Sequence, residues 1–257
     1  MRFDLSRGPH TPMKLLLTTL STLALLAPSR PSSNEPAPAP KSVATGAVKG
    51  KALFSGEAPK RRKVDMGSDP SCHALHKDEP LRDESMLVGE KGELGNVFVW
   101  ISKGLEGQKF EAPKEPAVLD QKGCTYVPHV LGLQVGQKLL IKNADPVTHN
   151  VHSFAKKNKA FNSSQQAGGK EIEQTFEKEE VLMQIKCDIH GWMSTYVGVV
   201  EHPFFAVTKT DGTFEIPNLP VGEYTLSAKH EALGLQKTQI KVVEGGAIET
   251  AFTFAEQ

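Results

Sequence analysis

Residues 181–187 predict a β-strand that ends in a cysteine, because apolar residues alternate there with mostly polar ones. A short loop then supplies His190 and Met193 before a second strand-like run at 195–200. We therefore expect a β-hairpin whose turn gathers a thiol, an imidazole and a thioether. The side chains expected on the inner face of the first strand are Val181, Met183, Ile185 and Cys187.

A second imidazole is expected from an earlier segment. Residues 137–143 predict a strand that leads into the turn dipeptide Asp145-Pro146, and His149 follows this turn. In an extended backbone, His149 and His152 lie on opposite faces, so only one of them can reach the ion held by the hairpin. His149 is the candidate, because it directly follows the turn.

One thiolate, two imidazoles and one thioether suit copper that cycles between Cu(I) and Cu(II). An isolated Cys-x2-His pair is also found as half of a zinc site, but a closed zinc site uses only cysteine and histidine and would leave Met193 idle. For Met193 alone, a methionine of the hydrophobic core is the alternative. The predicted metal ligands are His149, Cys187, His190 and Met193.

Three segments together resemble the cupredoxin family: the run 134–143, then His149-Asn150-Val151, then Cys187-x2-His190-x2-Met193. The compact ligand loop is most similar to those of amicyanin and plastocyanin, and the resemblance covers roughly 95–201. It implies a Greek-key β-sandwich and a mononuclear type 1 copper site. The equatorial ligands would be His149, Cys187 and His190, the axial ligand would be Met193, and Asn150 would tie the two ligand segments together.

The resemblance implies single-electron transfer with a redox partner protein, such as a c-type cytochrome or a periplasmic dehydrogenase or oxidase. The edge of His190 is the expected entry point for the electron, because its loop lies at the end of the domain. Trp192, Pro146 and Val147 would form an apolar rim around it. The sequence offers no group placed to act as acid, base or nucleophile, so we do not expect an enzyme.

The chain has three cysteines, an odd number, so at least one of them is not in an internal disulfide. With Cys187 as a ligand, Cys72 and Cys124 remain to form a disulfide. It would close a loop of about fifty residues and stabilise the fold by roughly 4 kcal/mol on the chain-entropy model. The alternative is a second metal site built from Cys72, His73 and His76.

The beginning of the chain predicts export. Met13-Lys14 precedes a largely apolar run at 15–26, which is typical of a secretory signal peptide and too short for a membrane-spanning helix. We assign 1–29 to this signal, with Met13 as an alternative start, and 30–45 to a linker rich in proline and alanine. The mature protein is expected to be periplasmic or secreted, without a transmembrane segment. The full chain has 30 lysine and arginine residues and 30 aspartate and glutamate residues, and this balanced charge gives no indication of nucleic-acid binding.

A second all-β domain is predicted after the copper domain. Asp211-Gly212 forms a turn between two strands, and Leu219-Pro220-Val221-Gly222-Glu223-Tyr224 follows, which resembles the transthyretin-like sandwich of carboxypeptidase regulatory domains. Residues 48–59 resemble the first strand and turn of the same sandwich. We predict that 46–66 and 203–257 form this domain and that 67–202, the cupredoxin domain, is inserted into it. The alternative places 48–54 as an edge strand on the copper domain.

Two other functions remain open from the sequence alone. The chain could be a periplasmic copper carrier or sensor, in which copper exchanges readily. It could also be a carbohydrate- or protein-binding module in which the copper domain plays a supporting part.

Overall fold

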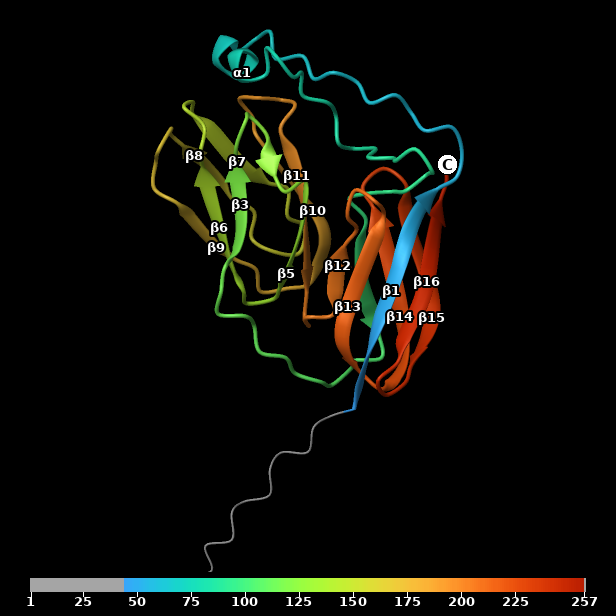
Figure 1. Cartoon of the computed structure of the whole chain (residues 1–257). Helices are drawn as coiled ribbons and strands as arrows, with labels where there is room; N and C mark the ends of the chain where they lie inside the picture. Colours follow the sequence, from blue (N-terminus) through green and yellow to red (C-terminus); the bar gives the residue numbers. More distant parts are fainter. Residues whose placement is uncertain (1–43, 257) are drawn as a thin grey trace, which may run out of the picture. The chain divides into compact units, whose positions relative to one another are not determined.

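The computed structural model describes residues 44–256, and this part of the chain contains sixteen strands and one short helix (Figure 1). The predicted all-β class is therefore confirmed. The predicted signal peptide, and all but the end of the predicted linker, lie outside the described residues. Within 44–256, no helix is long and apolar enough to cross a membrane.

The strands form four sheets with the orders β13-β1-β16, β12-β2-β14-β15, β5-β11-β10-β7-β8 and β4-β3-β6-β9. The elements are β1 (Thr45–Phe54), α1 (Pro70–Leu75), β2 (Phe98–Lys103), β3 (Ala117–Gln121), β4 (Tyr126–Val127), β5 (Val130–Gln134), β6 (Lys138–Asn143), β7 (His149–Ser153), β8 (Asn162–Gln165), β9 (Ile172–Thr175), β10 (Glu180–Lys186), β11 (Ser194–Val200), β12 (Phe205–Val207), β13 (Thr213–Pro220), β14 (Gly222–His230), β15 (Gly234–Val242) and β16 (Ala247–Phe254).

The sheets that contain β6 and β10 share one hydrophobic core. In β6, Leu139 and Ile141 are fully buried while Lys138 is exposed, as expected for a strand with one face against a core. Cys187 and Met193 belong to the same buried cluster. The residues that form the candidate metal site therefore lie in the packed interior of this sandwich.

The other two sheets enclose a second core, which includes β1. This strand pairs in antiparallel fashion with β13 and in parallel fashion with β16, so Val48 lies opposite both Ile216 and Ile248 (Figure 1). The Tyr224 hydroxyl donates to the carbonyl of Pro220 at 2.8 Å and fixes the corner between β13 and β14. Segment 45–54 thus pairs with the C-terminal strands β13 and β16. The predicted domain limits, 46–66 with 203–257 for one domain and 67–202 for the other, stay a prediction.

Strand β2 differs from the sequence prediction, which placed its residues in the copper domain. Its neighbours are β12 and β14 of the second sandwich. Residues Phe98, Val99, Trp100 and Ile101 are all buried, so neither face of the strand is polar, as is usual for a strand inside a sheet with both faces covered. Phe98 packs directly on Gly198, where an added Cβ would lie 2.5 Å from the ring.

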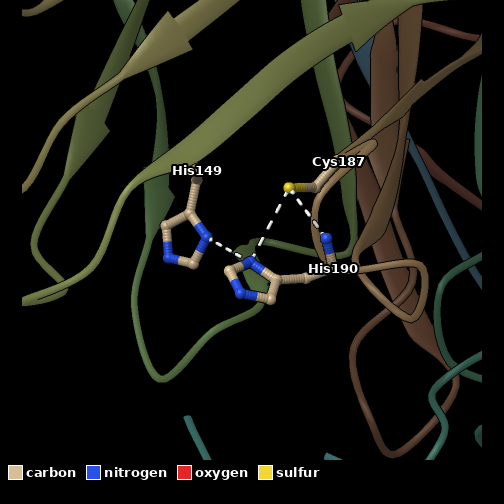
Figure 2. Close-up of side chains that lie close together, drawn as sticks. All are labelled: His149, Cys187 and His190. Carbon is tan, nitrogen blue, oxygen red and sulfur yellow. Dashed lines mark hydrogen bonds between the residues drawn. The ribbon is translucent and has the colours of Figure 1, made fainter. Parts of the chain in front are cut away.

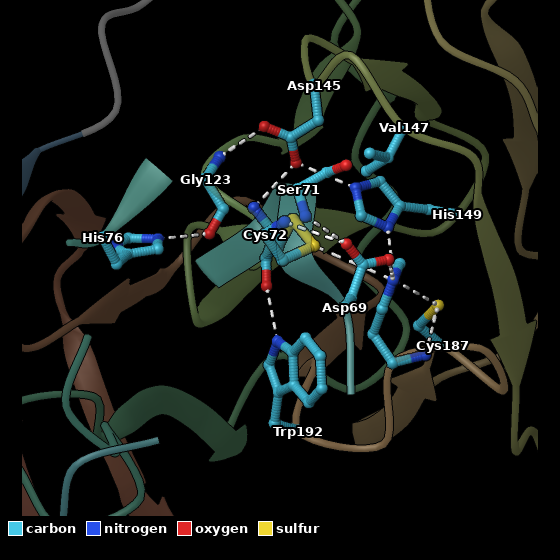
Figure 3. Close-up of a disulfide and its surroundings, with 12 residues drawn as sticks. Asp69, Ser71, Cys72, His76, Gly123, Asp145, Val147, His149, Cys187 and Trp192 are labelled. Carbon is cyan, nitrogen blue, oxygen red and sulfur yellow. Dashed lines mark hydrogen bonds and ion pairs between the residues drawn. A yellow bond between two sulfur atoms is a disulfide. The ribbon is translucent and has the colours of Figure 1, made fainter. Parts of the chain in front are cut away.

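The long connection from β1 to β2 contains α1. Residues 64–81, which we call the cap, are closed at their base by a hydrogen bond from Val64 N to Leu81 O of 2.9 Å. The disulfide Cys72–Cys124 joins α1 to the segment between β3 and β4, which confirms the predicted pairing (Figure 3). The alternative second metal site is wrong, because the sulfur of Cys72 is bonded to Cys124, and His76 Nε2 contacts the Gly123 carbonyl at 2.7 Å instead.

Candidate metal centre

Three of the four predicted ligands meet in the structure. His149 begins β7, Cys187 follows β10, and His190 lies in the loop before β11 (Figure 2). The Nδ1 atoms of His149 and His190 are 2.9 Å apart, and Cys187 Sγ lies 3.8 Å from His190 Nδ1. One nitrogen or sulfur atom of each residue lies within 4.8 Å of the others, and all three residues are buried.

These separations are close to those that one ion requires. With metal–sulfur and metal–nitrogen bonds of about 2.3 and 2.0 Å, tetrahedral geometry separates sulfur from nitrogen by about 3.5 Å and the two nitrogens by about 3.3 Å. The imidazole rings would have to move apart by only a few tenths of an ångström to admit an ion. The donor set and its spacing therefore fit one metal ion bound by all three residues.

The outward nitrogen of each imidazole faces a carboxylate. His149 Nε2 donates to Asp145 Oδ2 at 2.8 Å, and His190 Nε2 donates to Asp69 Oδ2 at 3.0 Å. With Nε2 donating to a carboxylate, Nδ1 is the nitrogen that faces the cluster, and its lone pair can bind an ion once Nδ1 carries no proton. Both histidines are therefore held in the orientation that a metal ligand needs.

The cluster stabilises a thiolate. Burial opposes ionisation of Cys187, but hydrogen bonds from the His149 imidazole and from the backbone N–H groups of Asn150 and His190 lower the pKa of the thiol to about 7. Burial likewise opposes the charge of His149, but the Asp145 carboxylate and the Cys187 thiolate raise the pKa of the imidazole to about 9. A bound cation would take the place of the proton beside this thiolate.

Asn150 connects β7 to the loop after β10. Its backbone N–H donates to Cys187 Sγ at 3.4 Å, its side-chain oxygen accepts from Asp188 N, and its Nδ2 donates to Asp188 Oδ2 at 3.2 Å. Met193 is fully buried in the core cluster that contains Cys187, and its backbone N–H donates to His190 O at 2.9 Å. Its axial role stays a prediction.

The cap covers the His190 side chain, and electron entry at its edge stays a prediction. His190 is only 2% exposed, because the cap covers it through Asp69 and Cys72. Trp192 is half-buried beside it, with ring centroids 5.1 Å apart. The indole N–H donates to the backbone carbonyl of Cys124 at 3.0 Å, and an apolar rim of Trp192, Pro146 and Val147 stays a prediction.

Sequence reasoning missed both carboxylates. The sequence marks Asp145 only as part of the turn Asp145-Pro146. In the structure its side chain is 5% exposed and also accepts hydrogen bonds from the backbone N–H groups of Gly123 and Cys124, at 2.6 and 2.8 Å. Asp69-Pro70 is a helix-start signal. That signal predicts α1 but not that the helix covers His190.

Comparison with known proteins gives partial matches. A family model for the beta-sandwich domain of ER membrane protein complex subunit 7 matches residues 190–256. This match supports a β-sandwich in the C-terminal segment, and the carboxypeptidase regulatory-like assignment stays a prediction. No curated protein sequence matches the chain.

Among solved structures, a purple cupredoxin from Nitrosopumilus maritimus is 28% identical, with a TM-score of 0.28, over 32% of this chain and 98% of its own. A mutant of amicyanin in the Cu(I) form is 20% identical, with a TM-score of 0.30, over 39% of this chain and 97% of its own. The Cu-containing nitrite reductase of Thermus scotoductus SA-01 is 22% identical, with a TM-score of 0.31, over 36% of this chain. The match spans only 24% of that reductase, and similarity at these TM-scores assigns no function.

Proposed function

We propose that the protein binds one copper ion through His149, Cys187 and His190, with Met193 as the axial ligand, and transfers single electrons to and from a redox partner protein. The observation that carries this proposal is the meeting of a buried thiolate with two imidazole Nδ1 atoms, each oriented by a carboxylate on the opposite nitrogen. Bound copper would supply a one-electron Cu(I)/Cu(II) couple.

The residues around the cluster favour outer-sphere transfer. The cluster is buried, so water is largely excluded from its donor atoms. His149 begins β7, and Cys187 and His190 lie in the short loop that joins β10 to β11, so the ends of paired strands hold the donors in place. Asp145 is fixed by two backbone N–H groups and therefore cannot swing away from His149. Such a constrained site needs little rearrangement when its charge changes by one.

An oxidising compartment is part of the proposal. The Cys72–Cys124 disulfide is typical of proteins that are exported from the reducing cytosol. We place the protein in the periplasm or outside the cell, with a c-type cytochrome or a periplasmic dehydrogenase or oxidase as the partner class.

The test separates electron transfer from the carrier alternative. Protein loaded with one equivalent of copper is cycled between ascorbate and ferricyanide while a copper chelator is present in excess. An electron-transfer protein keeps its copper through many cycles, because both imidazoles and the thiolate are buried and braced. Loss of the metal to the chelator within a few cycles would favour a copper carrier and contradict the proposal.

Replacing Trp192 with leucine is expected to slow electron exchange with external reagents. The indole lies against His190 and also lines a cleft of about 380 Å³ with Gly191 and Ser194, so it connects the buried cluster to the surface. Stopped-flow oxidation by ferricyanide should be several-fold slower, at an unchanged reduction potential. Phe154→Leu, on an exposed aromatic residue away from this cleft, is the matched control and should keep the wild-type rate.

A further inference from the structure

Two residues of the cap, Asp69 and Cys72, contact His190 of the candidate metal centre. Asp69 Oδ2 lies 3.0 Å from His190 Nε2, and Cys72 Sγ lies 3.7 Å from the same nitrogen. Met66 and Cys72 of the cap are buried in the core cluster that also contains Cys187. The cap is therefore packed into the sandwich beside the site.

Asp69 uses its two carboxylate oxygens for different partners. Oδ1 accepts from the backbone N–H groups of Ser71 and Cys72, at 2.8 and 3.0 Å, and so caps the start of α1. Oδ2 accepts from His190. The two oxygens therefore connect the start of α1 to the imidazole of His190.

The two cysteines of the disulfide each donate a hydrogen bond to a carboxylate that faces one of the imidazoles. On one side, the backbone N–H of Cys72 donates to Asp69, which faces His190. On the other side, the backbone N–H of Cys124 donates to Asp145 at 2.8 Å, and Asp145 faces His149. The disulfide therefore joins the two cysteines whose backbone N–H groups hold the two carboxylates, Asp69 and Asp145.

We propose that Asp69 is a positioning residue of the metal centre, and that the Cys72–Cys124 disulfide holds Asp69 in place. This inference rests on the proposed function. Asp69 keeps the proton of His190 on Nε2, so that Nδ1 presents its lone pair beside Cys187 and His149. Without Asp69, the His190 imidazole can rotate or change tautomer. One of the three buried donors then no longer points at the ion.

The first experiment compares Asp69→Ser with Asp65→Ser. Serine caps a helix about as well as aspartate, so Asp69→Ser keeps α1 but is too short to reach His190. Asp65 is an exposed aspartate of the cap whose one side-chain hydrogen bond within residues 44–256 is accepted from Gly67 N, so Asp65→Ser makes the same chemical change away from the site. Thermal unfolding of the metal-free proteins checks that both variants are folded.

Copper affinity is measured by competition with a chelator of known affinity, and the Cu(II) EPR spectrum is recorded. Asp69→Ser should bind copper about 10–100-fold more weakly, as is typical when the partner of a ligating histidine is lost. Its EPR spectrum should change as well, which a merely structural role would not cause. Asp65→Ser should match the wild type in both measurements.

A second experiment removes the disulfide with the double variant Cys72→Ala/Cys124→Ala, alone and combined with Asp69→Ser. If the disulfide acts through Asp69, the combined variant should lose much less affinity than the sum of the separate losses. Full additivity would contradict the coupling. If Asp69→Ser keeps the wild-type copper affinity and EPR spectrum, the positioning role of Asp69 is overturned while the proposed function stands. A wild-type protein that binds no copper would instead overturn the proposed function, and this role with it.

Discussion

Cys187→Ser is expected to lower copper affinity by more than 100-fold, because losing only the partner of a ligand costs about 10–100-fold. The variant removes the one thiolate of the cluster and leaves a hydroxyl, which is a poor ligand for Cu(I). His149 keeps its hydrogen bond to Asp145, so the fold around the site should remain intact. Chelator competition under reducing conditions measures the loss.

His152→Ala is the matched control for Cys187→Ser. His152 lies on the same strand as His149, but its Nδ1 faces Asp188 at 3.1 Å, outside the cluster. Its removal should leave copper affinity at the wild-type value. Equal losses in the two variants would mean that Cys187 matters no more than a residue outside the cluster, which would contradict its role as a ligand.

His129→Gln is expected to cost about 3–5 kcal/mol of unfolding free energy, the usual cost of leaving one partner of a buried ion pair without the other. His129 Nε2 pairs with Glu231, and both side chains are at most 10% exposed. Burial opposes the charge of His129, but Glu231, helped by Glu84 and Asp83, raises the pKa of the imidazole. The pair connects the segment before β5 to the turn between β14 and β15.

The pH dependence of this loss follows from the raised pKa. Because the folded-state pKa of His129 exceeds the unfolded value of about 6.5, the stabilisation is complete below that pH and declines as pH rises through the folded-state pKa. Urea unfolding should therefore show a larger difference between wild type and His129→Gln at about pH 6 than at about pH 9. Glu173→Gln, which breaks an exposed ion pair with Lys138, should leave stability unchanged. A difference that grows with pH would refute the assignment.

Local sequence patterns predicted the arrangement of the hairpin well. Met183, Ile185 and Cys187 are buried in one core, as strand alternation requires, and His149 rather than His152 lies beside Cys187 and His190. These relations depend on residue spacing along single strands, which the sequence displays directly. Copper binding by these residues stays a prediction.

Two local departures had no sequence signal. The register of β10 shifts between Glu180 and Met183, and Leu182 has a φ of 57°. This irregularity turns Val181 away from the expected core and packs it with Phe98 and Trp100. No glycine marks the position, so the alternation pattern could not reveal it.

The cap could not be predicted because its contacts are distant in sequence. Asp69 and His190 are separated by 121 positions, and nothing near Asp69 indicates which surface it covers. The cysteine count predicted the disulfide that anchors the cap, but not the place of that disulfide beside the imidazoles. The loop alone places His190 at the end of the domain, and only the tertiary packing shows that the cap covers its imidazole.

The central claim is a thiolate–copper centre at Cys187, His149 and His190. The most direct test is the visible and EPR spectrum of the purified protein loaded with one equivalent of Cu(II). We predict an intense thiolate-to-copper absorption band and a narrow parallel hyperfine splitting. A colourless protein that retains zinc, or Cu(II) with an ordinary tetragonal spectrum, would contradict the claim.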